Sequence, residues 1–479
     1  MSEHFSSLNR RNFLVSSGIC LASLCAGCAG IDRFKNSKEK KNIIFIFTDD
    51  QRWDAIGYAN PVLHTPNLDR FSAQGLRFNN AFITLPVCSP ARATAVTGRY
   101  TKANGVTTYH NPMDEQEVGF ARYFNEAGYL TGHVGKWHIP EKGPRAFEFQ
   151  IVRQLGNGAP YWNPSVLEDG KRRQYEGYST DYCAEQTIDI IKTSQQQEKP
   201  FCIWLCTQAP HDRSVDKGGN WLSDETKAIY NEQRLSQLPV PPNINDDLSG
   251  KPPYLKTFRA RRNIMNKGPM TDERYRDRQG YFGQITEMDK SLGKLFSALD
   301  EMNLRENTYV IFMSDNGLFL GEHGLMSKAL HYEESIRVPM FAVGPGIPKG
   351  YEDSMVTNAD IAPTILDLAG ISVPGNMHGE SLKKTLLRQK PLNREYVLFE
   401  LPDYNEMLET NPAYTIRSKR WKYIQTFENG KDKPYTFEEL YDLENDPYEM
   451  SNLIKGFKDK KLLNKLRAEL EKQRARYSK

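Results

Sequence analysis

Four short runs of consecutive apolar residues stand out along the 479-residue chain. Each run is rich in β-branched and aromatic residues, so each predicts a strand that is buried on both faces. The runs are residues 42–47, 201–206, 309–313 and 338–343. Amphipathic stretches with a helical period lie at residues 67–74 and 280–301. Buried strands that alternate with helices predict an α/β fold, in which helices cover both faces of a mostly parallel central sheet.

The pattern changes beyond about residue 389. Residues 396–400, 414–417 and 421–424 are short and partly alternating, which is typical of antiparallel strands. The leucines after residue 460 follow a helical period with lysines and arginines between them, which predicts an amphipathic helix. We therefore expect a large α/β domain over residues 42–389 and a smaller α+β subdomain with antiparallel strands over residues 390–479.

The N-terminal residues read as an export signal. Arg10 and Arg11 precede a short apolar stretch, which ends in small residues around Cys28. The arginine pair resembles a twin-arginine signal, and the residues up to Cys28 resemble a lipoprotein cleavage box. We expect an export signal in residues 1–28, a linker in residues 29–41, and a periplasmic or membrane-anchored location with a lipid anchor at Cys28.

Composition excludes several other classes of protein. Hydrophobic residues make up 39% of the chain and charged residues 26%, as in an ordinary globular enzyme. The net charge of +3 gives no reason to expect nucleic acid as a partner. Only four of the seven cysteines lie beyond the N-terminal 28 residues, and they form no CxxC pair. This number and spacing argue against both a disulfide framework and a zinc site.

Oxygen-donor side chains follow two of the expected buried strands. Asp49 and Asp50 come directly after the first run, and Asp315 and Asn316 follow the third. In open α/β sheets, ligands bind beyond the carboxyl ends of the strands. Carboxylate and amide oxygens are ligands for a hard cation such as Ca²⁺ or Mg²⁺, so these four side chains predict a cation site.

Cys88 stands at the start of an expected helix, with Ser89 as a capping residue and Pro90 in the first turn. The N-terminus of a helix favours an anion, so a bare cysteine there could be a thiolate of low pKa. A hard cation, however, prefers oxygen to a thiolate, so an unmodified cysteine fits poorly beside the expected cation site.

The residues around Cys88 match a known modification signal. The segment reads Cys-Ser-Pro-Ala-Arg from Cys88 to Arg92, and Thr-Gly-Arg follows at residues 97–99. Further motifs are Thr-Asp-Asp at 48–50, Gly-Lys-Trp-His at 135–138, Ser-Asp-Asn-Gly at 314–317, Gly-Glu-His-Gly at 321–324 and Glu-Leu-Tyr-Asp-Leu at 439–443. In this order the motifs resemble those of the type I, formylglycine-dependent sulfatases of the alkaline phosphatase-like superfamily.

The resemblance implies a modified residue and a metal. Cys88 would be oxidised to formylglycine (3-oxoalanine) by a formylglycine-generating enzyme. One Ca²⁺ ion would be bound by the side chains of Asp49, Asp50, Asp315 and Asn316 together with an oxygen of the modified Cys88.

The resemblance also implies catalytic roles for five other residues. Arg92 would hold the hydrated aldehyde, and Lys136 and Lys328 would bind the sulfate group. His138 would be the partner of the hydrated aldehyde, and His211 would protonate the leaving alcohol. One hydroxyl of the hydrate would attack sulfur, and loss of a proton from the other would release sulfate, a step that serine could not make.

The expected function is hydrolysis of a sulfate ester, on an extracellular sulfated glycan. Two alternatives stay open: a formylglycine-dependent phosphonate or phosphodiester hydrolase of the same superfamily, and a non-catalytic glycan-binding lipoprotein. We expect the residues that select the substrate in the poorly patterned segments 146–178 and 212–276. Individual candidates for this role are Tyr109, His110, Trp162 and Arg213.

Overall fold

The structure is a computed structural model, and it describes residues 40–140, 149–156, 158–211, 221–257, 268, 270–427 and 435–479. The expected export signal, Cys28 and nearly all of the linker lie outside the described residues. Lys41–Lys479 form one compact unit. Within the described ranges, no helix is both long enough and apolar enough to cross a membrane.

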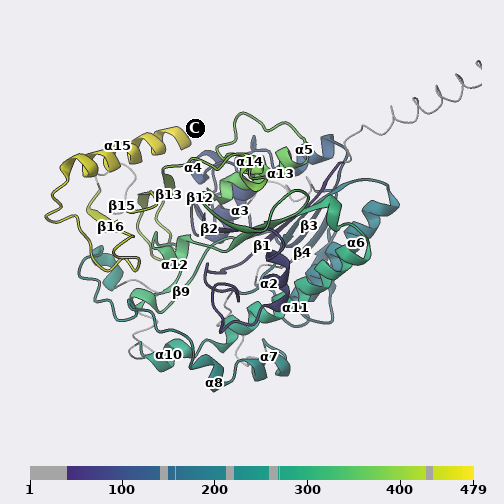
Figure 1. Cartoon of the computed structure of the whole chain (residues 1–479), viewed down its shortest axis with the longest axis horizontal. Helices are drawn as coiled ribbons and strands as arrows, with labels where there is room; N and C mark the ends of the chain where they lie inside the picture. The colour runs from purple at the N-terminus through teal and green to yellow at the C-terminus, as the bar shows by residue number, and fades with distance from the viewer. Residues whose placement is uncertain are drawn as a thin grey trace, which may run out of the picture. The chain divides into compact units, whose positions relative to one another are not determined.

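A ten-stranded sheet forms the centre of this unit (Figure 1). In spatial order its strands are β12 (Gly350–Thr357), β2 (Leu76–Phe82), β11 (Met340–Val343), β8 (Thr308–Ser314), β1 (Asn42–Thr48), β7 (Phe201–Cys206), β3 (Leu130–Lys136), β4 (Ile151–Leu155), β5 (Ser165–Glu168) and β6 (Lys171–Gln174). Strands β8, β1, β7, β3 and β4 run parallel. The expected α/β fold with a mostly parallel sheet is therefore confirmed.

Strand β1 lies in the middle of the sheet and is buried along its whole length. Its side chains alternate between the two faces, as the pleat of a strand requires. Ile44 and Ile46 belong to one hydrophobic core, and Ile43, Phe45 and Phe47 belong to the other. Because both faces are covered, every position from Ile43 to Phe47 is apolar, which explains the continuous run in the sequence.

Helices cover both faces of the sheet. On the side of Ile44 and Ile46 lie α2 (Pro66–Ser72), α6 (Ser179–Gln196) and α11 (Gln279–Glu301), and on the opposite side lie α3 (Cys88–Thr97), α5 (Phe120–Glu126) and α13 (Ile361–Leu368). The shorter α-helices are α4 (Thr101–Asn104), α7 (Asp224–Ile229), α8 (Glu232–Leu235), α10 (Asp272–Arg276), α12 (Glu333–Ile336) and α14 (Lys383–Leu386). The 3₁₀ turns within the described ranges are η2 (Pro253–Lys256), η3 (Arg305–Asn307), η4 (Glu322–Gly324) and η5 (Asn358–Asp360).

One of the four apolar runs differs from its neighbours in direction. Strand β11 pairs antiparallel with both β8 and β2. A parallel neighbour of β8 needs a crossover connection over a face of the sheet, which a helix usually makes. The chain from β8 to β11 instead contains the small hairpin of β9 (Phe319–Leu320) and β10 (Met326–Ser327), followed by the four-residue α12. It therefore returns to the same edge in the opposite direction.

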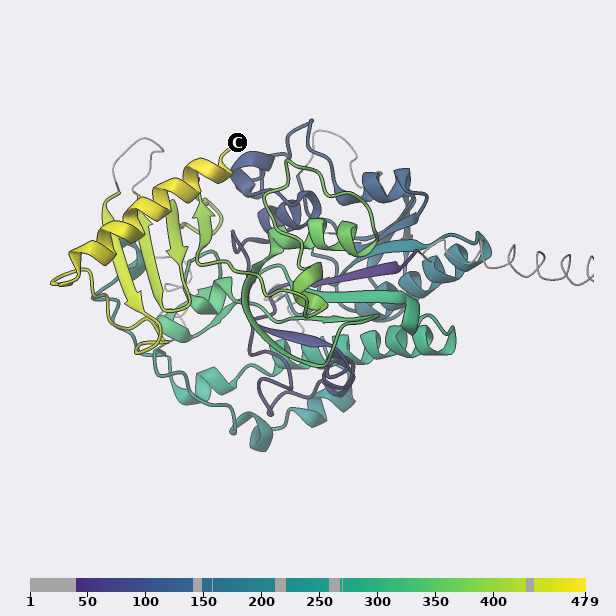
Figure 2. The same cartoon turned by 45° about the horizontal axis from the view of Figure 1, so that its top comes forward.

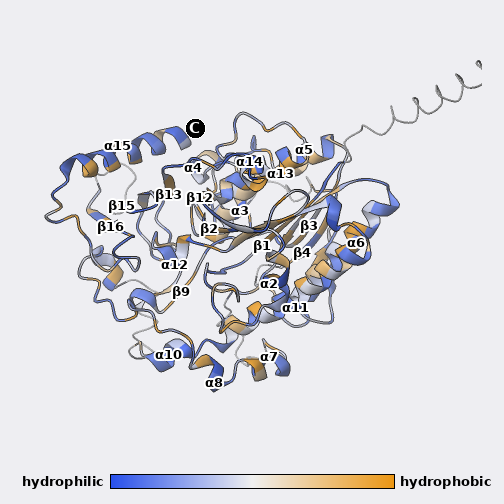
Figure 3. Cartoon of the chain, in the orientation of Figure 1, coloured by the Kyte–Doolittle hydropathy of each residue, from blue (hydrophilic) through white to orange (hydrophobic). Residues whose placement is uncertain are grey.

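A separate four-stranded antiparallel sheet lies in the C-terminal part of the unit (Figure 2). Its strands are β13 (Val397–Leu401), β14 (Ala413–Arg417), β15 (Trp421–Thr426) and β16 (Phe437–Asp442), in that order. The helix α15 (Lys460–Tyr477) packs Leu463, Leu466 and Leu470 against the sheet and is otherwise mostly hydrophilic (Figure 3). The predicted antiparallel strands and terminal helix are present, while the boundary near residue 389 stays a prediction.

Buried ion pairs join this small sheet to the rest of the unit. Arg417 of β14 contacts Glu333 of α12 with Nε···Oε1 at 3.0 Å. Lys422 of β15 lies 2.8 Å from the same Glu333 oxygen and 2.7 Å from Glu449. Removing one partner of such a pair would leave an uncompensated buried charge, at a cost of about 3–5 kcal/mol. The small sheet therefore depends electrostatically on α12.

Strand β3 requires glycine near its end. Gly135 has φ +95°, a region that favours glycine, and a Cβ there would overlap the carbonyl oxygen of Cys206 in β7 and lie 3.3 Å from Cys183 Sγ. The next residue, Lys136, ends β3. Close packing between β3 and β7 therefore fixes the position of Lys136.

We expect Gly135→Ala to lower the free energy of unfolding by about 2–4 kcal/mol, because backbone strain and overlap add. Gly170→Ala is the matched control: Gly170 has φ +82° with nothing within 4 Å of the added Cβ, so only the strain of about 1 kcal/mol is expected. Urea unfolding of both variants measures the difference. Equal losses would contradict the proposed role of β3–β7 packing.

Candidate functional site

Carboxylates from two neighbouring strand ends lie in contact. Asp49 and Asp50 follow β1, and Asp315 and Asn316 follow β8, its parallel neighbour. The backbone N–H of Asp50 donates to Asp315 Oδ1 at 3.1 Å, and Asn316 Nδ2 donates to Asp50 Oδ1 at 2.6 Å. All four side chains are buried. The structure thus brings together the four oxygen-donor residues that the sequence predicted at one edge of the sheet.

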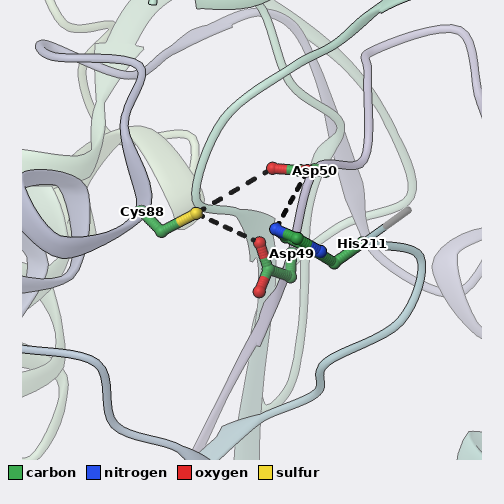
Figure 4. A group of neighbouring side chains, drawn as sticks. All are labelled: Asp49, Asp50, Cys88 and His211. Atoms are coloured by element: carbon green, nitrogen blue, oxygen red, sulfur yellow. Dashed lines mark hydrogen bonds and ion pairs between the residues drawn. The ribbon is translucent and has the colours of Figure 1, made fainter. Parts of the chain in front are cut away.

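Cys88 lies at the first position of α3, directed towards these carboxylates (Figure 4). Its thiol donates to Asp49 Oδ1 at 3.3 Å and lies 4.0 Å from Asp50 Oδ1. The expectation that Ser89 caps this helix is wrong: the N-cap is Val87, whose side chain cannot cap, and Ser89 lies inside the helix with its hydroxyl buried. The helix starts two residues earlier than expected, so Cys88 itself carries one of its first backbone N–H groups.

Three buried cations surround the carboxylates. Arg92, one turn after Cys88 in α3, contacts Asp315 Oδ2 through Nε at 3.1 Å and Nη2 at 2.8 Å. Lys136 at the end of β3 forms an ion pair with Asp49, and Lys328 forms one with Asp50. Lys328 Nζ also lies 2.8 Å from Cys88 Sγ. Three positive charges therefore balance the three carboxylates of Asp49, Asp50 and Asp315.

The surrounding charges and burial shift the pKa values of Asp49 and Asp315. Burial would raise the pKa of Asp49, but Lys136, His211, Arg92 and Lys328 together hold it well below its usual value. Burial and the neighbouring Asp49 raise the pKa of Asp315 to about 6, against the opposing effect of Arg92.

The Cys88 thiol behaves in the opposite way from an activated nucleophile. Burial raises its pKa far above the ordinary value for cysteine, and the carboxylates of Asp315 and Asp49 add to this effect. An unmodified Cys88 is therefore a neutral thiol, and a reactive cysteine would need the reverse shift.

A metal ion fits the donor set. Asp49, Asp50, Cys88 and His211 each offer an atom within 4.8 Å of the others. Asn316 donates through Nδ2, while its buried Oδ1 has no hydrogen-bond partner among the described residues. A buried acceptor without a donor calls for an unobserved cation or water. Together with the carboxylate oxygens of Asp49, Asp50 and Asp315, this amide oxygen forms a set of hard donors that suits Ca²⁺.

The two predicted histidines lie at the rim of this cluster. His211 Nε2 is 3.7 Å from Asp50 Oδ2, and burial lowers the pKa of His211 while Asp50 and Asp49 oppose the shift. His138 follows β3 with φ +57°, and its ring centroid is 5.6 Å from that of Tyr109. Burial, followed by the charge of Lys136, lowers the pKa of His138 to about 2. Both imidazoles are therefore largely neutral at neutral pH.

A cavity of about 540 Å³ opens onto the cluster, a size typical of small-ligand sites. Asp50, His211 and Lys328 line it, as do the following residues: Tyr109, Trp221, Arg274, Asp277, Arg278, Gly280, Tyr281, Leu318, Phe319, Leu320, Met326, Ser327, Met407 and Leu408.

The cavity tests the sequence-based guesses about its lining. Tyr109 lines it, and His110 and Trp162 do not. Arg213 lies outside the described residues. Trp221 and Arg274 come from the expected segment 212–276, but none of the described residues of segment 146–178 lines the cavity. His331 lies beside a second, much smaller cavity, where its Nδ1 contacts Thr415 Oγ1 at 2.8 Å.

Several lining residues were missed by sequence reasoning. Met407 and Leu408 come from the C-terminal part, and Leu318, Leu320 and Met326 come from the β9–β10 hairpin region. Apolar residues in short loops carry no periodic signal. Leu318, Leu320 and Met326 lie near Asn316 and Lys328 in the sequence, which does not identify a cavity wall, and Met407 and Leu408 lack even that signal.

Comparison with known proteins identifies the class to which this site belongs. Residues 41–371 match the family model described as sulfatase, and residues 321–476 match the model of the C-terminal part of N-sulphoglucosamine sulphohydrolase. The chain belongs to the sulfatase family, in the alkaline phosphatase-like superfamily. It is accordingly a sulfatase, an enzyme that hydrolyses sulfate esters.

Individual relatives are distant but cover the chain almost completely. The chain is 28% identical to an N-acetylglucosamine-6-O-sulfatase of Bacteroides thetaiotaomicron, with 94% of this chain and 89% of that protein covered. A structure solved in complex with its substrate D-glucosamine-2-N,6-O-disulfate is 26% identical, with a TM-score of 0.81 and coverage of 92% and 98%. A phosphonate monoester hydrolase from Silicibacter pomeroyi shares the fold, with a TM-score of 0.73, 20% identity and coverage of 91% and 96%.

Proposed function

We propose that this sulfatase hydrolyses a sulfate ester on a sulfated glycan, with Cys88 converted to formylglycine and one bound Ca²⁺. The observation that carries the proposal is the position of Cys88, whose thiol is neutral and buried between Asp49 and Lys328. A neutral, buried thiol is a poor nucleophile and a poor ligand for a hard cation. An oxygen in its place would bind the same cation as the surrounding carboxylate and amide oxygens. Two similar proteins support a sulfated sugar as substrate: the N-acetylglucosamine-6-O-sulfatase, and the protein solved in complex with its substrate D-glucosamine-2-N,6-O-disulfate.

The proposed modification and metal each supply one chemical capability. A formylglycine hydrate supplies a hydroxyl nucleophile together with a second hydroxyl whose deprotonation allows sulfate to leave. The metal, held by Asp49, Asp50, Asp315 and Asn316, supplies Lewis acidity towards sulfuryl oxygens.

Two of the buried cations, Lys136 and Lys328, are proposed to bind the sulfate group. Three cations and three carboxylates leave the protein groups neutral overall. A divalent ion adds two positive charges, and a sulfate monoester brings one negative charge, so the filled site attracts the substrate. Lys328, 2.8 Å from Cys88 Sγ, lies nearest the reacting atom and is placed to stabilise charge that develops on the sulfuryl oxygens.

Arg92 is proposed to position the residue at 88 and not to bind the sulfate group. Its Nη1 donates to the carbonyl of Lys136 at 2.8 Å and its other nitrogens contact Asp315. Arg92 therefore ties the start of α3 to the ends of β3 and β8. The same contacts would hold the hydrated aldehyde at position 88 against the carboxylates.

His211 is proposed to protonate the leaving alcohol, because it lines the cavity beside Asp50. An anionic ester bound next to the ring would raise the pKa of His211, which burial otherwise lowers. The imidazole would thus take up its proton when substrate binds. His138, with a buried Nδ1 that has no partner among the described residues, is proposed to accept the proton of the second hydroxyl.

The sequence-based proposal of export through residues 1–28, with a lipid anchor at Cys28 and a periplasmic location, is retained beside this function. It is consistent with a polymeric substrate outside the cell.

We expect the peptide that contains Cys88 to be lighter than its encoded mass by about 18 Da, the change from cysteine to an aldehyde. Cys88→Ala should lose aryl sulfatase activity by roughly 10³-fold or more, since the nucleophile is removed. Cys202→Ala is the matched control, because Cys202 is equally buried in β7 but belongs to the hydrophobic core. An unmodified thiol in fully active protein would refute the proposed nucleophile.

A phosphonate monoester hydrolase has the same fold. Hydrolysis of a phosphonate ester or phosphodiester is therefore a second function to be tested directly. Sulfate monoesters and phosphodiesters both carry a single negative charge, so the charge balance of the site does not separate them. We expect kcat/KM to be higher for an aryl sulfate than for the matching aryl phosphodiester by about tenfold or more. A preference for the diester would replace the proposed sulfate substrate.

We expect Ca²⁺ affinity to rise with pH up to about 6 and then to level off. Below the pKa of Asp315, which is about 6, the carboxyl holds a proton that a cation must displace, so affinity falls by up to tenfold per pH unit. Calorimetric titration of metal-free protein with Ca²⁺ at about pH 5 and about pH 7.5 measures the change in affinity. Asp315→Asn should bind Ca²⁺ weakly without that pH dependence.

Asp289→Asn is the control for the metal titration. Burial also raises the pKa of Asp289 to about 6, but this carboxyl accepts hydrogen bonds from Asn67 and Leu68 at the start of α2. The variant should therefore keep the wild-type pH dependence of Ca²⁺ binding. Loss of the dependence in Asp289→Asn, or its survival in Asp315→Asn, would show that another group titrates.

A further inference from the structure

Asp49 and Asp50 reach the same cluster although they are consecutive in the chain. Successive side chains of an extended strand point to opposite faces of the sheet. Asp49 Oδ1 nevertheless lies 3.3 Å from Cys88 Sγ, and Asp50 Oδ1 lies 4.0 Å from the same atom (Figure 4). The alternation that β1 follows must therefore end where these two residues meet.

The backbone of Asp50 makes this change of direction. Its φ is +62°, in the left-handed region that residues other than glycine rarely adopt. Aspartate tolerates this conformation better than most residues, but its extended and right-handed conformations are still lower in energy. A chain that followed only its local preference would turn the Asp50 carboxylate away from the cluster. Contacts from elsewhere in the fold must therefore hold Asp50 in place.

One side chain of α11 binds the backbone on both sides of Gln51. The Tyr281 hydroxyl donates to the carbonyl of Asp50 at 2.7 Å and accepts the backbone N–H of Arg52 at 3.1 Å. Burial raises the pKa of Tyr281 above its ordinary value, so the phenol keeps the proton that it donates. The two hydrogen bonds fix a carbonyl and an N–H two residues apart, and so they fix the turn that begins at Asp50.

The hydrophobic core fixes Tyr281 in turn. Tyr281 lies in the first turn of the 23-residue helix α11 and is buried. It belongs to the core on the side of Ile44 and Ile46, and it also lines the cavity. A tyrosine has only two side-chain torsions, so packing its ring leaves the hydroxyl little freedom. The hydroxyl is therefore a rigid support for the turn.

Hydrogen bonds within the two strand ends support the same turn. The backbone N–H of Gln51 donates to Ser314 Oγ at 2.9 Å, and Thr48 Oγ1 donates to Gln51 Oε1 at 2.9 Å. These two contacts hold Gln51, whereas the Tyr281 hydroxyl holds the carbonyl of Asp50 itself. The conformation of Asp50 therefore depends most directly on Tyr281.

We propose that Tyr281 is a positioning residue for the metal site: its hydroxyl holds Asp50 in the left-handed conformation and so keeps the carboxylates of Asp49 and Asp50 together for Ca²⁺. A set of ligands that is already in place binds a cation more tightly than one that must first be ordered. Tyr281 acts through Asp50 and binds neither the metal nor the sulfate group. The proposal rests on the proposed function, since it takes both aspartates as Ca²⁺ ligands.

Calorimetric titration of metal-free protein with Ca²⁺ tests this role of Tyr281. We expect Tyr281→Phe to bind Ca²⁺ about tenfold more weakly, because the variant keeps the ring and removes the hydroxyl that fixes the turn. Aryl sulfatase activity should fall when Ca²⁺ is limiting and recover when Ca²⁺ is saturating. KM for the aryl sulfate should change by less than about twofold.

Tyr230→Phe is the matched control. The Tyr230 hydroxyl is also buried, accepts the backbone N–H of His64 at 2.9 Å, and contacts Thr286 Oγ1 of α11 at 2.8 Å. Tyr230 does not line the cavity and holds no carboxylate of the cluster. This variant loses the same kind of hydrogen bonds, so it should keep the wild-type affinity for Ca²⁺.

A second variant covers the case in which Tyr281→Phe does not fold. Thr48→Val has nearly the same shape and removes the hydrogen bond between Thr48 and Gln51, at the other side of the turn. It should weaken Ca²⁺ binding by about threefold or more. Wild-type affinity in Thr48→Val, when Tyr281→Phe does not fold, overturns the proposal.

Three other results also overturn it. The first is wild-type Ca²⁺ affinity in folded Tyr281→Phe, including the case in which KM for the aryl sulfate rises, which would make the hydroxyl a substrate contact. The second is equal weakening of Ca²⁺ binding in Tyr230→Phe. The third is a wild-type protein that binds no Ca²⁺, which refutes the proposed metal as well. Failure of the positioning role alone is therefore distinguishable from failure of the proposed function.

Discussion

The structure depends on one electrostatic constraint: three carboxylates are buried together and must be neutralised. Asp49, Asp50 and Asp315 are almost fully removed from water, and isolated charges in that position would cost several kcal/mol each. Arg92, Lys136 and Lys328 supply the compensation from a helix start, a strand end and a loop that leaves a hairpin. Close packing at Gly135 and the start of α3 at Cys88 therefore serve the same purpose, because each fixes one of these charges.

Much of the fold could be predicted because its central strands are buried on both faces. The apolar runs of β1, β7 and β8 have no other simple interpretation. Strand β3, with the sequence Leu-Thr-Gly-His-Val-Gly-Lys, was not predicted because glycine and polar residues interrupt it. The direction of β11 was also not predictable, since it follows from a hairpin and a short helix that carry little periodic signal.

Some residues of the site could likewise be predicted from the sequence, and others could not. Asp49 and Asp315 directly follow predicted strands, so their place in a cation site could be predicted from the sequence. Lys136 was predicted only through the resemblance of its Gly-Lys-Trp-His motif to that of the sulfatases. Tyr109 was one guess among four, and only its position in the cavity wall distinguishes it from His110. Ser89 shows the limit of local rules: Val87 takes the capping position, and the helix begins with Cys88.

The C-terminal sheet has a consequence for how such enzymes diversify. It contacts α12 through buried ion pairs, and the same part of the chain lends Met407 and Leu408 to the cavity. A recombination event that exchanged this part between two family members would change the cavity wall while leaving the carboxylate cluster untouched. An exchanged segment that lacked cations in place of Arg417 and Lys422 would leave Glu333 buried without compensation, at a cost of about 3–5 kcal/mol. Such an exchange would therefore change the cavity wall without loss of the fold only if it supplied these charges.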